Sequence, residues 1–129
     1  MTISLSTADV ARKYVELVGS HDLEPLQELF ADNLTAKVGD DSFDKAAWIA
    51  ALGRFLPALI RNDVRHVFAD GNDAAVIYDF VTDSPAGAVP CVETVSVEAG
   101  KIASIHLIFE RLHWQEFLNT LRERANRTT

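Results

Sequence analysis

The feature that most limits how this chain can fold is a change in the spacing of its apolar residues after Pro57. Before that point apolar residues recur every three or four positions, and after it they alternate with polar ones. Alternation predicts strands, and connections of two to four residues between them predict antiparallel hairpins. Four such strands are expected, over residues 64–69, 74–83, 88–98 and 101–110.

Helical segments flank this meander. Residues able to cap a helix, namely Ser6, Asp22 and Asp44, predict three helix starts, and a fourth helix is expected over about 113–124. A short strand over 34–38 and a turn over 39–42 lie between the second and third helices. Strands in one run with helices gathered around them predict an α+β fold, with the helices on one face of a curved antiparallel sheet.

Length and composition narrow the class of protein. The 129 residues fit a single domain over 1–129 with a core over about 6–125, and 48% hydrophobic residues predict that it folds. A net charge of −7 argues against binding to nucleic acid or to an anionic membrane surface. No apolar run approaches the ~20 residues of a membrane helix, and no signal peptide is visible, so a cytoplasmic location is expected.

Motifs for cofactors are missing from the sequence. Cys91 is the only cysteine, which leaves no internal disulfide and no cysteine-based metal cluster. The four histidines lack the spacing of metal ligands, and no Gly-rich phosphate loop or nucleophile elbow is found. We therefore expect neither a metal nor another cofactor.

Alternation also sorts the strand residues into two faces. One face is mainly apolar and is assigned to the side that the helices cover; it carries Val76, Tyr78, Phe80, Cys91, Glu93, Val95, Val97, Ile105, Leu107 and Phe109. The other face keeps enough apolar residues to leave a patch on a monomer, which predicts a homodimer through it. The residues of this predicted interface are Ile77, Asp79, Val81, Ile102, His106 and Ile108.

Glu93 breaks the pattern of the apolar face. A carboxylate there costs free energy unless it is paired, or protonated because its pKa is raised. The alternative is that Glu93 lies near the strand end and reaches water.

Several segments of the chain resemble a known superfamily. These are the run ARKYVELV over 11–18, DLE over 22–24, LFADN over 29–33 and GKIASI over 100–105. They resemble the nuclear transport factor 2 (NTF2)-like superfamily, within it the SnoaL-like polyketide cyclases and ketosteroid isomerases. The resemblance implies a cone-shaped, cystatin-like sheet wrapped around helices that enclose one pocket. This superfamily contains enzymes and also non-enzymatic binding modules.

The resemblance to ketosteroid isomerases also implies roles for individual residues. Tyr14 matches the tyrosine that donates a hydrogen bond to an enolate oxygen. Glu93 falls near the position of a protonated carboxylic acid that donates to the same oxygen. The base position falls on Val38, which cannot move a proton, and this argues against ketosteroid isomerase activity itself. Two residues are alternative bases. Asp40 lies two residues after Val38, and His66, by strand alternation, shares a face with inward-pointing residues. Tyr14, Asp40 and His66 each also have a structural interpretation, as a core tyrosine, a solvated turn residue and a structural histidine.

The sequence thus predicts a cofactor-free, proton-transferring enzyme of isomerase or cyclase type, acting on an apolar molecule with a carbonyl or hydroxyl group. A non-catalytic binding or scaffold protein of the same fold is the alternative. The expected catalytic residues are Tyr14, Glu93, His66 and Asp40. The expected pocket walls are Phe30, Val38, Tyr78, Phe80, Cys91, Val95, Leu107 and Phe109.

Overall fold

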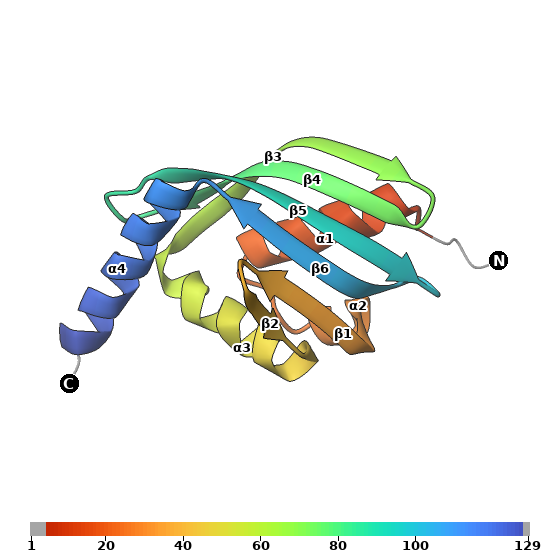
Figure 1. Cartoon of the computed structure of the whole chain (residues 1–129), viewed down its shortest axis with the longest axis horizontal. Helices are drawn as coiled ribbons and strands as arrows, with labels where there is room; N and C mark the ends of the chain where they lie inside the picture. The colour runs from red at the N-terminus through yellow and green to blue at the C-terminus, as the bar shows by residue number, and fades with distance from the viewer. Residues whose placement is uncertain (1–4, 128–129) are drawn as a thin grey trace.

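The four alternating segments form the larger part of a six-stranded curved sheet in the computed structural model, which describes residues 5–127 (Figure 1). The ends of the predicted domain, 1–4 and 128–129, lie outside the described residues. The helical elements are α1 (Thr7–Gly19), α2 (Leu26–Leu29), α3 (Lys45–Phe55), the 3₁₀ turn η1 (Leu56–Ala58) and α4 (Arg111–Arg127). The strands are β1 (Phe30–Val38), β2 (Asp41–Phe43), β3 (Leu59–Asp70), β4 (Asp73–Thr82), β5 (Ala88–Glu98) and β6 (Lys101–Phe109).

The strand order of the sheet is β2-β1-β6-β5-β4-β3. All neighbours are antiparallel except β1 and β6, which run parallel and pair Val38 with Leu107 at the end of β1. Helices α1 and α3 lie on the same side of the sheet, while α4 leaves the end of β6 and extends away from it (Figure 1). The α+β class and the curved sheet are therefore confirmed.

Two of the predicted helix caps are present. The Ser6 Oγ accepts a hydrogen bond from the Asp9 N–H at 3.1 Å, and the Asp44 Oδ1 accepts one from the Ala47 N–H at 2.8 Å. At the start of α4 the Glu110 carboxylate accepts from the backbone N–H of Leu112 and of His113. This cap begins the last helix two residues earlier than the apolar spacing predicted.

The segment between α1 and α3 differs from the prediction. Helix α2 is a single turn without a side-chain cap, so Asp22 does not begin it. Phe30 begins β1 directly after this turn and lies opposite Ile102 of β6. The expected turn over 39–42 is shorter, because Asp41 and Ser42 already pair with β1 in strand β2. Pairing with strands distant in the sequence overrides the local helical spacing here.

Two β-bulges shift the alternation and overturn two assignments. On β3, Val64 lies opposite Tyr78 but His66 lies opposite Ile77, so His66 faces outward rather than into the fold. It is exposed and stacks on Phe68. On β6, the bulge between Ile102 and Ser104 turns Ile102 inward, where it is fully buried, so Ile102 does not belong to the outer face.

The core lies between the concave face of the sheet and the helices. Its largest fully buried side chains are Trp48, Tyr14, Phe30, Phe117, Leu26, Leu34, Ile102 and Ile105. Among the described residues, no helix has the length and apolar character needed to cross a membrane.

Candidate functional site

A small polar cluster lies inside this apolar core. We call Tyr14, Trp48, Tyr78 and Glu93 the carboxyl cluster; their exposed fractions are 0%, 1%, 3% and 5%. Tyr14 comes from the buried stripe of α1, and Trp48 from that of α3. Tyr78 and Glu93 lie on the inner face of neighbouring strands, where Val76 is the direct partner of Glu93 and Cys91 that of Tyr78. Four elements thus bring one residue each to the same place.

Hydrogen bonds link the cluster in pairs. The Tyr78 hydroxyl donates to the Glu93 Oε1. The Trp48 Nε1–H donates to the Tyr14 hydroxyl oxygen at 3.2 Å. The second carboxyl oxygen of Glu93, Oε2, is buried and has no hydrogen-bond partner among the described residues. Buried polar atoms without a partner are rare in folded proteins, so this oxygen needs an explanation.

Burial decides the charge state that the cluster favours. Removal from water raises the pKa of Glu93, and the nearby Tyr14 hydroxyl, together with the Tyr78 hydroxyl that donates to Oε1, opposes this rise only in part. Burial and the nearby Glu93 carboxyl also raise the pKa of both tyrosines well above their ordinary value. The cluster therefore favours neutral hydroxyls and a neutral carboxylic acid.

Cys91, next to this cluster on β5, is not an activated thiol. Burial raises its pKa, and Glu93 raises it further. Its Sγ lies 3.4 Å from the Val89 carbonyl oxygen, to which the thiol donates a hydrogen bond.

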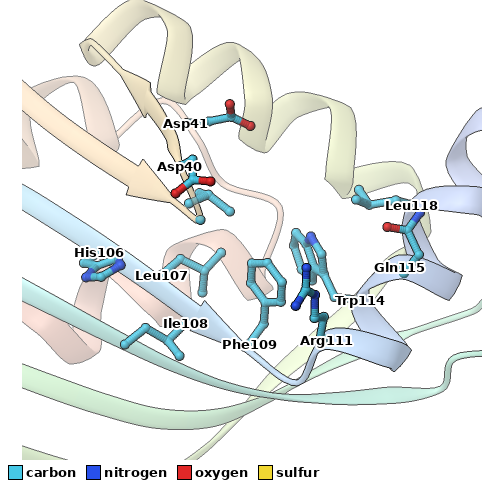
Figure 2. A pocket seen from close by; sticks show the side chains of 12 residues that line it. Asp40, Asp41, His106, Leu107, Ile108, Phe109, Arg111, Trp114, Gln115 and Leu118 are labelled. Carbon is cyan, nitrogen blue, oxygen red and sulfur yellow. The ribbon is translucent and has the colours of Figure 1, made fainter.

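A hollow of about 630 Å³ opens at the end of β6 (Figure 2). Strand β1 stops at Val38 opposite Leu107, so the last residues of β6 have no β1 neighbour beyond that pair. Helix α4 bounds the far side, where Trp114 stacks on Phe109 with ring centroids 4.6 Å apart. The lining residues are Val38, Gly39, Asp40, Asp41, His106, Leu107, Ile108, Phe109, Arg111, Trp114, Gln115 and Leu118.

The predicted pocket walls divide between this hollow and the core. Val38, Leu107 and Phe109 line the hollow. The remaining predicted walls, Phe30, Tyr78, Phe80, Cys91 and Val95, are buried core residues with at most 4% exposure. Leu107 joins the two regions, because it lines the hollow and is the cross-strand partner of Glu93. Leu107 is therefore the residue that adjoins both the hollow and Glu93 of the carboxyl cluster.

The two alternative bases occupy different places. Asp40 is exposed at the turn between β1 and β2 and lines the hollow, across from Arg111 and Gln115 (Figure 2). His66 lies on the outer face, away from the carboxyl cluster. Among residues 5–127, no group of three His, Cys, Asp or Glu side chains is placed to hold a metal ion.

Sequence reasoning missed two contributors to the site. The sequence gives Trp48 no site role, because nothing in helical spacing reveals that its N–H finds a tyrosine on another helix. Tyr78 was expected as a wall of the pocket rather than as a hydrogen-bond donor. A signal for Tyr78 existed, since same-face residues displaced by two positions on neighbouring strands are within reach of a long side chain.

The comparisons with known proteins agree with this architecture. A family model described as a SnoaL-like domain matches residues 11–105. The chain belongs to the SnoaL-like family. Solved structures with this arrangement are described as NTF2-like or as having a cystatin-like fold. No curated protein sequence matches this SnoaL-like chain significantly.

Three solved structures illustrate the range of its structural relatives. A protein from Kribbella flavida DSM 17836 is 26% identical with a TM-score of 0.78, covering 92% of this chain and 99% of the other. IdmH from Streptomyces antibioticus, a candidate polyketide cyclase, is 18% identical with a TM-score of 0.72, covering 89% and 99%. A candidate ketosteroid isomerase from Kribbella flavida DSM 17836 is 18% identical with a TM-score of 0.72, covering 81% and 78%.

Proposed function

We propose that this SnoaL-like protein is a small-molecule enzyme of isomerase or cyclase type that transfers protons without a cofactor. Its substrate would be an apolar molecule with a carbonyl or hydroxyl group. The family membership and the isomerase-like and cyclase-like structural relatives support this class of activity. The observation that carries the proposal is the unpartnered Oε2 of the buried Glu93.

The chemistry follows from a count of donors and acceptors. A neutral Glu93 has one acidic proton, and Tyr78 already occupies Oε1 as a donor. The proton on Oε2 then lacks an acceptor, and the group that would satisfy it is an acceptor such as a carbonyl or enolate oxygen. Charge that develops on such an oxygen in a site without water is strongly stabilised by donors already in place.

Tyr14 would be the second donor to the same oxygen. Its hydroxyl oxygen accepts from Trp48, which leaves its own proton available. The proton removed from carbon would pass to Asp40, the alternative base that lines the hollow. The substrate would enter through the hollow and reach Glu93 by displacing the Leu107 side chain.

A non-catalytic binding protein is the second candidate function, and one observation favours it. Neither alternative base lies in the carboxyl cluster, since Asp40 is exposed at the turn and His66 is on the outer face. In that case the cluster would hold a ligand oxygen without any proton leaving carbon.

A deuterium-exchange assay separates the two functions. Apolar ketones, including enones, are incubated with the protein in D₂O, and incorporation next to the carbonyl is followed by mass spectrometry. The enzyme predicts exchange that falls at least about tenfold in E93L and in D40N. Exchange no faster than buffer, with ligand still bound, would favour the binding protein.

Binding of para-nitrophenol tests the cluster independently of turnover, because a phenolate imitates an enolate oxygen. We expect E93L to weaken binding at least about tenfold, since it removes a charge-assisted hydrogen bond while keeping side-chain volume. V97A, on the same face of β5, is the matched control and should bind normally. Equal binding by wild type, E93L and V97A would remove Glu93 from the site.

We also propose that a second copy of the chain covers the outer face of the sheet. Ile77 and Val81 are half-buried there, and Ile108 is 49% exposed. Asp79 pairs with Arg65 at the same face, so its charge is compensated. A cytoplasmic location remains a prediction, with which the single, buried cysteine is compatible.

A further inference from the structure

The direction of the hydrogen bond between α3 and α1 carries an inference that rests on the proposed function and deepens it. We infer that Trp48 is a positioning residue, which fixes the direction of the Tyr14 proton and thereby makes Tyr14 a donor at the carboxyl cluster. Trp48 itself need not touch the substrate.

The argument begins with the chemistry of indole. The indole Nε1–H can donate a hydrogen bond but cannot accept one. In the contact of 3.2 Å between Trp48 and Tyr14, the tyrosine oxygen must therefore be the acceptor. A tyrosine or serine in place of Trp48 would allow the Tyr14 proton to point in either direction. With tryptophan at position 48, the Tyr14 hydroxyl proton cannot take part in this contact.

The surroundings of Tyr14 favour Glu93 as the partner of its proton. Tyr14 is fully buried, so water does not compete for its hydroxyl. The aromatic edge of Phe30 packs against its ring at a centroid distance of 5.5 Å and offers no conventional acceptor. Glu93 is the acidic group whose charge acts on Tyr14, and the Tyr14 hydroxyl in turn lowers the pKa of Glu93. With its oxygen occupied by the indole N–H, the Tyr14 hydroxyl is left to donate, and Glu93 is the nearby acidic group that this hydroxyl stabilises.

A second bond in the cluster completes this arrangement. The Tyr78 hydroxyl occupies Oε1 of Glu93, so the free oxygen is Oε2. A ligand oxygen that enters between Tyr14 and Glu93 would then accept the Tyr14 proton in place of Glu93, and would also accept the proton at Oε2 of a neutral Glu93. The Trp48 bond also lowers the pKa of Tyr14, because a donor to the phenol oxygen stabilises its anionic form. Trp48 thus directs the Tyr14 hydroxyl proton away from the indole and makes the Tyr14 hydroxyl a stronger hydrogen-bond donor.

The first test uses the protein without ligand and follows Glu93 by ¹³C NMR after selective labelling of glutamate carboxyls. In W48F the Tyr14 proton is no longer directed, so the pKa of Glu93 should rise above that of the wild type. F43L is the matched control, since Phe43 packs on the Trp48 ring at 5.4 Å and takes no part in the hydrogen bonds. It should leave the Glu93 titration unchanged. A Glu93 titration in W48F equal to that in F43L would overturn the inference.

If W48F fails to fold, a second measurement tests the same hydrogen bond by changing Tyr14 instead of Trp48. In Y14F, which keeps Trp48, the indole N–H loses its acceptor, and its proton resonance should move upfield. Y78F removes a hydroxyl that does not touch the indole and should leave this resonance in place. An unmoved indole resonance in Y14F would show that the bond does not exist in solution.

Binding of para-nitrophenol then separates this inference from the proposed function. We expect W48F to weaken binding about tenfold relative to F43L, a loss typical of one well-aimed hydrogen bond. If wild type binds no phenol while the NMR effects are present, the proposed function fails and the positioning role stands. If phenol binds in a Glu93-dependent way but W48F and F43L bind equally, the positioning role fails and the proposed function stands.

Discussion

At the scale of the residue, the chain tolerates an ionisable group that its core would ordinarily reject. Glu93 is 5% exposed, and one of its oxygens has no partner among the described residues. Burial raises the pKa of Glu93 and so favours its protonated form, while the two neutral tyrosine hydroxyls offset part of that rise. The strand alternation predicted that Glu93 faces the core, because parity is reliable over a regular strand. It failed for His66 and Ile102, since a bulge at each site adds one residue and leaves no mark in the sequence.

The raised pKa of Glu93 predicts how stability changes with pH. The folded pKa lies above the ordinary value of 4.5, so the folded state holds a proton that the unfolded state has lost. This contribution to stability is fully present below pH 4.5 and is lost as pH rises through the folded pKa. The free energy of unfolding of the wild type, relative to E93Q, should therefore decrease as pH rises through that window. Urea titrations of both proteins at a series of pH values measure the free energy of unfolding of the wild type minus that of E93Q. A difference that grows with pH contradicts the account.

At the scale of the element, the site depends on how closely helix α1 approaches strand β3. A Cβ added at Gly19, at the end of α1, would lie 2.8 Å from the backbone nitrogen of Asn62. The Asn62 side chain in turn donates to the Val15 carbonyl at 3.0 Å, which fixes the helix on the strand. The apolar spacing of α1 and its cap at Ser6 were predicted from the sequence. The one-turn α2 and strand β2 were not. Helix α2 is cut short because Phe30 pairs with Ile102 of the distant β6, and β2 is only a three-residue strand within the expected turn.

Helix α1 approaches β3 closely at Gly19, whereas Gly53 on α3 has space around it. The same substitution should therefore have different effects on stability at these two glycines. G19A should destabilise the protein by roughly 1–3 kcal/mol, since backbone atoms must move to make room for the methyl group. G53A is the control, because only Leu23 Cδ1 lies nearby, at 3.9 Å, and alanine is the better helix former. It should be neutral or stabilise by up to about 1 kcal/mol. Equal effects of the two substitutions in urea unfolding would show that α1 does not pack as closely as described.

At the scale of the whole molecule, the parallel pairing of β1 with β6 creates the hollow. Because β1 ends opposite Leu107, the end of β6 stays open between the β1–β2 turn and α4. The hairpins could be predicted from local alternation, but this pairing joins residues about seventy positions apart and has no local signal. The same sheet leaves an outer face that none of the described helices covers (Figure 1). Ile77 and Val81 are half-buried on this face, and Ile108 is exposed.

That outer face predicts the oligomeric state. A homodimer through it should become monomeric in I77K, because two charges would then be buried opposite apolar residues. L112K adds the same charge at Leu112, which is 78% exposed in the first turn of α4 and outside the strands, and should remain dimeric. Sedimentation velocity distinguishes the species. A wild-type monomer, or loss of the dimer in both variants, would contradict an interface on the sheet.

The account as a whole depends on an uncharged acid beneath the helices, and one NMR experiment tests this claim most directly. The ¹³C chemical shift of the Glu93 carboxyl, assigned by comparison with E93Q, is measured as pH is raised from about 4 toward 7, across the ordinary pKa of a glutamate. The account predicts that the resonance keeps the shift of a protonated acid past the point where exposed glutamates have ionised. A Glu93 resonance already at the carboxylate position at about pH 5 would contradict it.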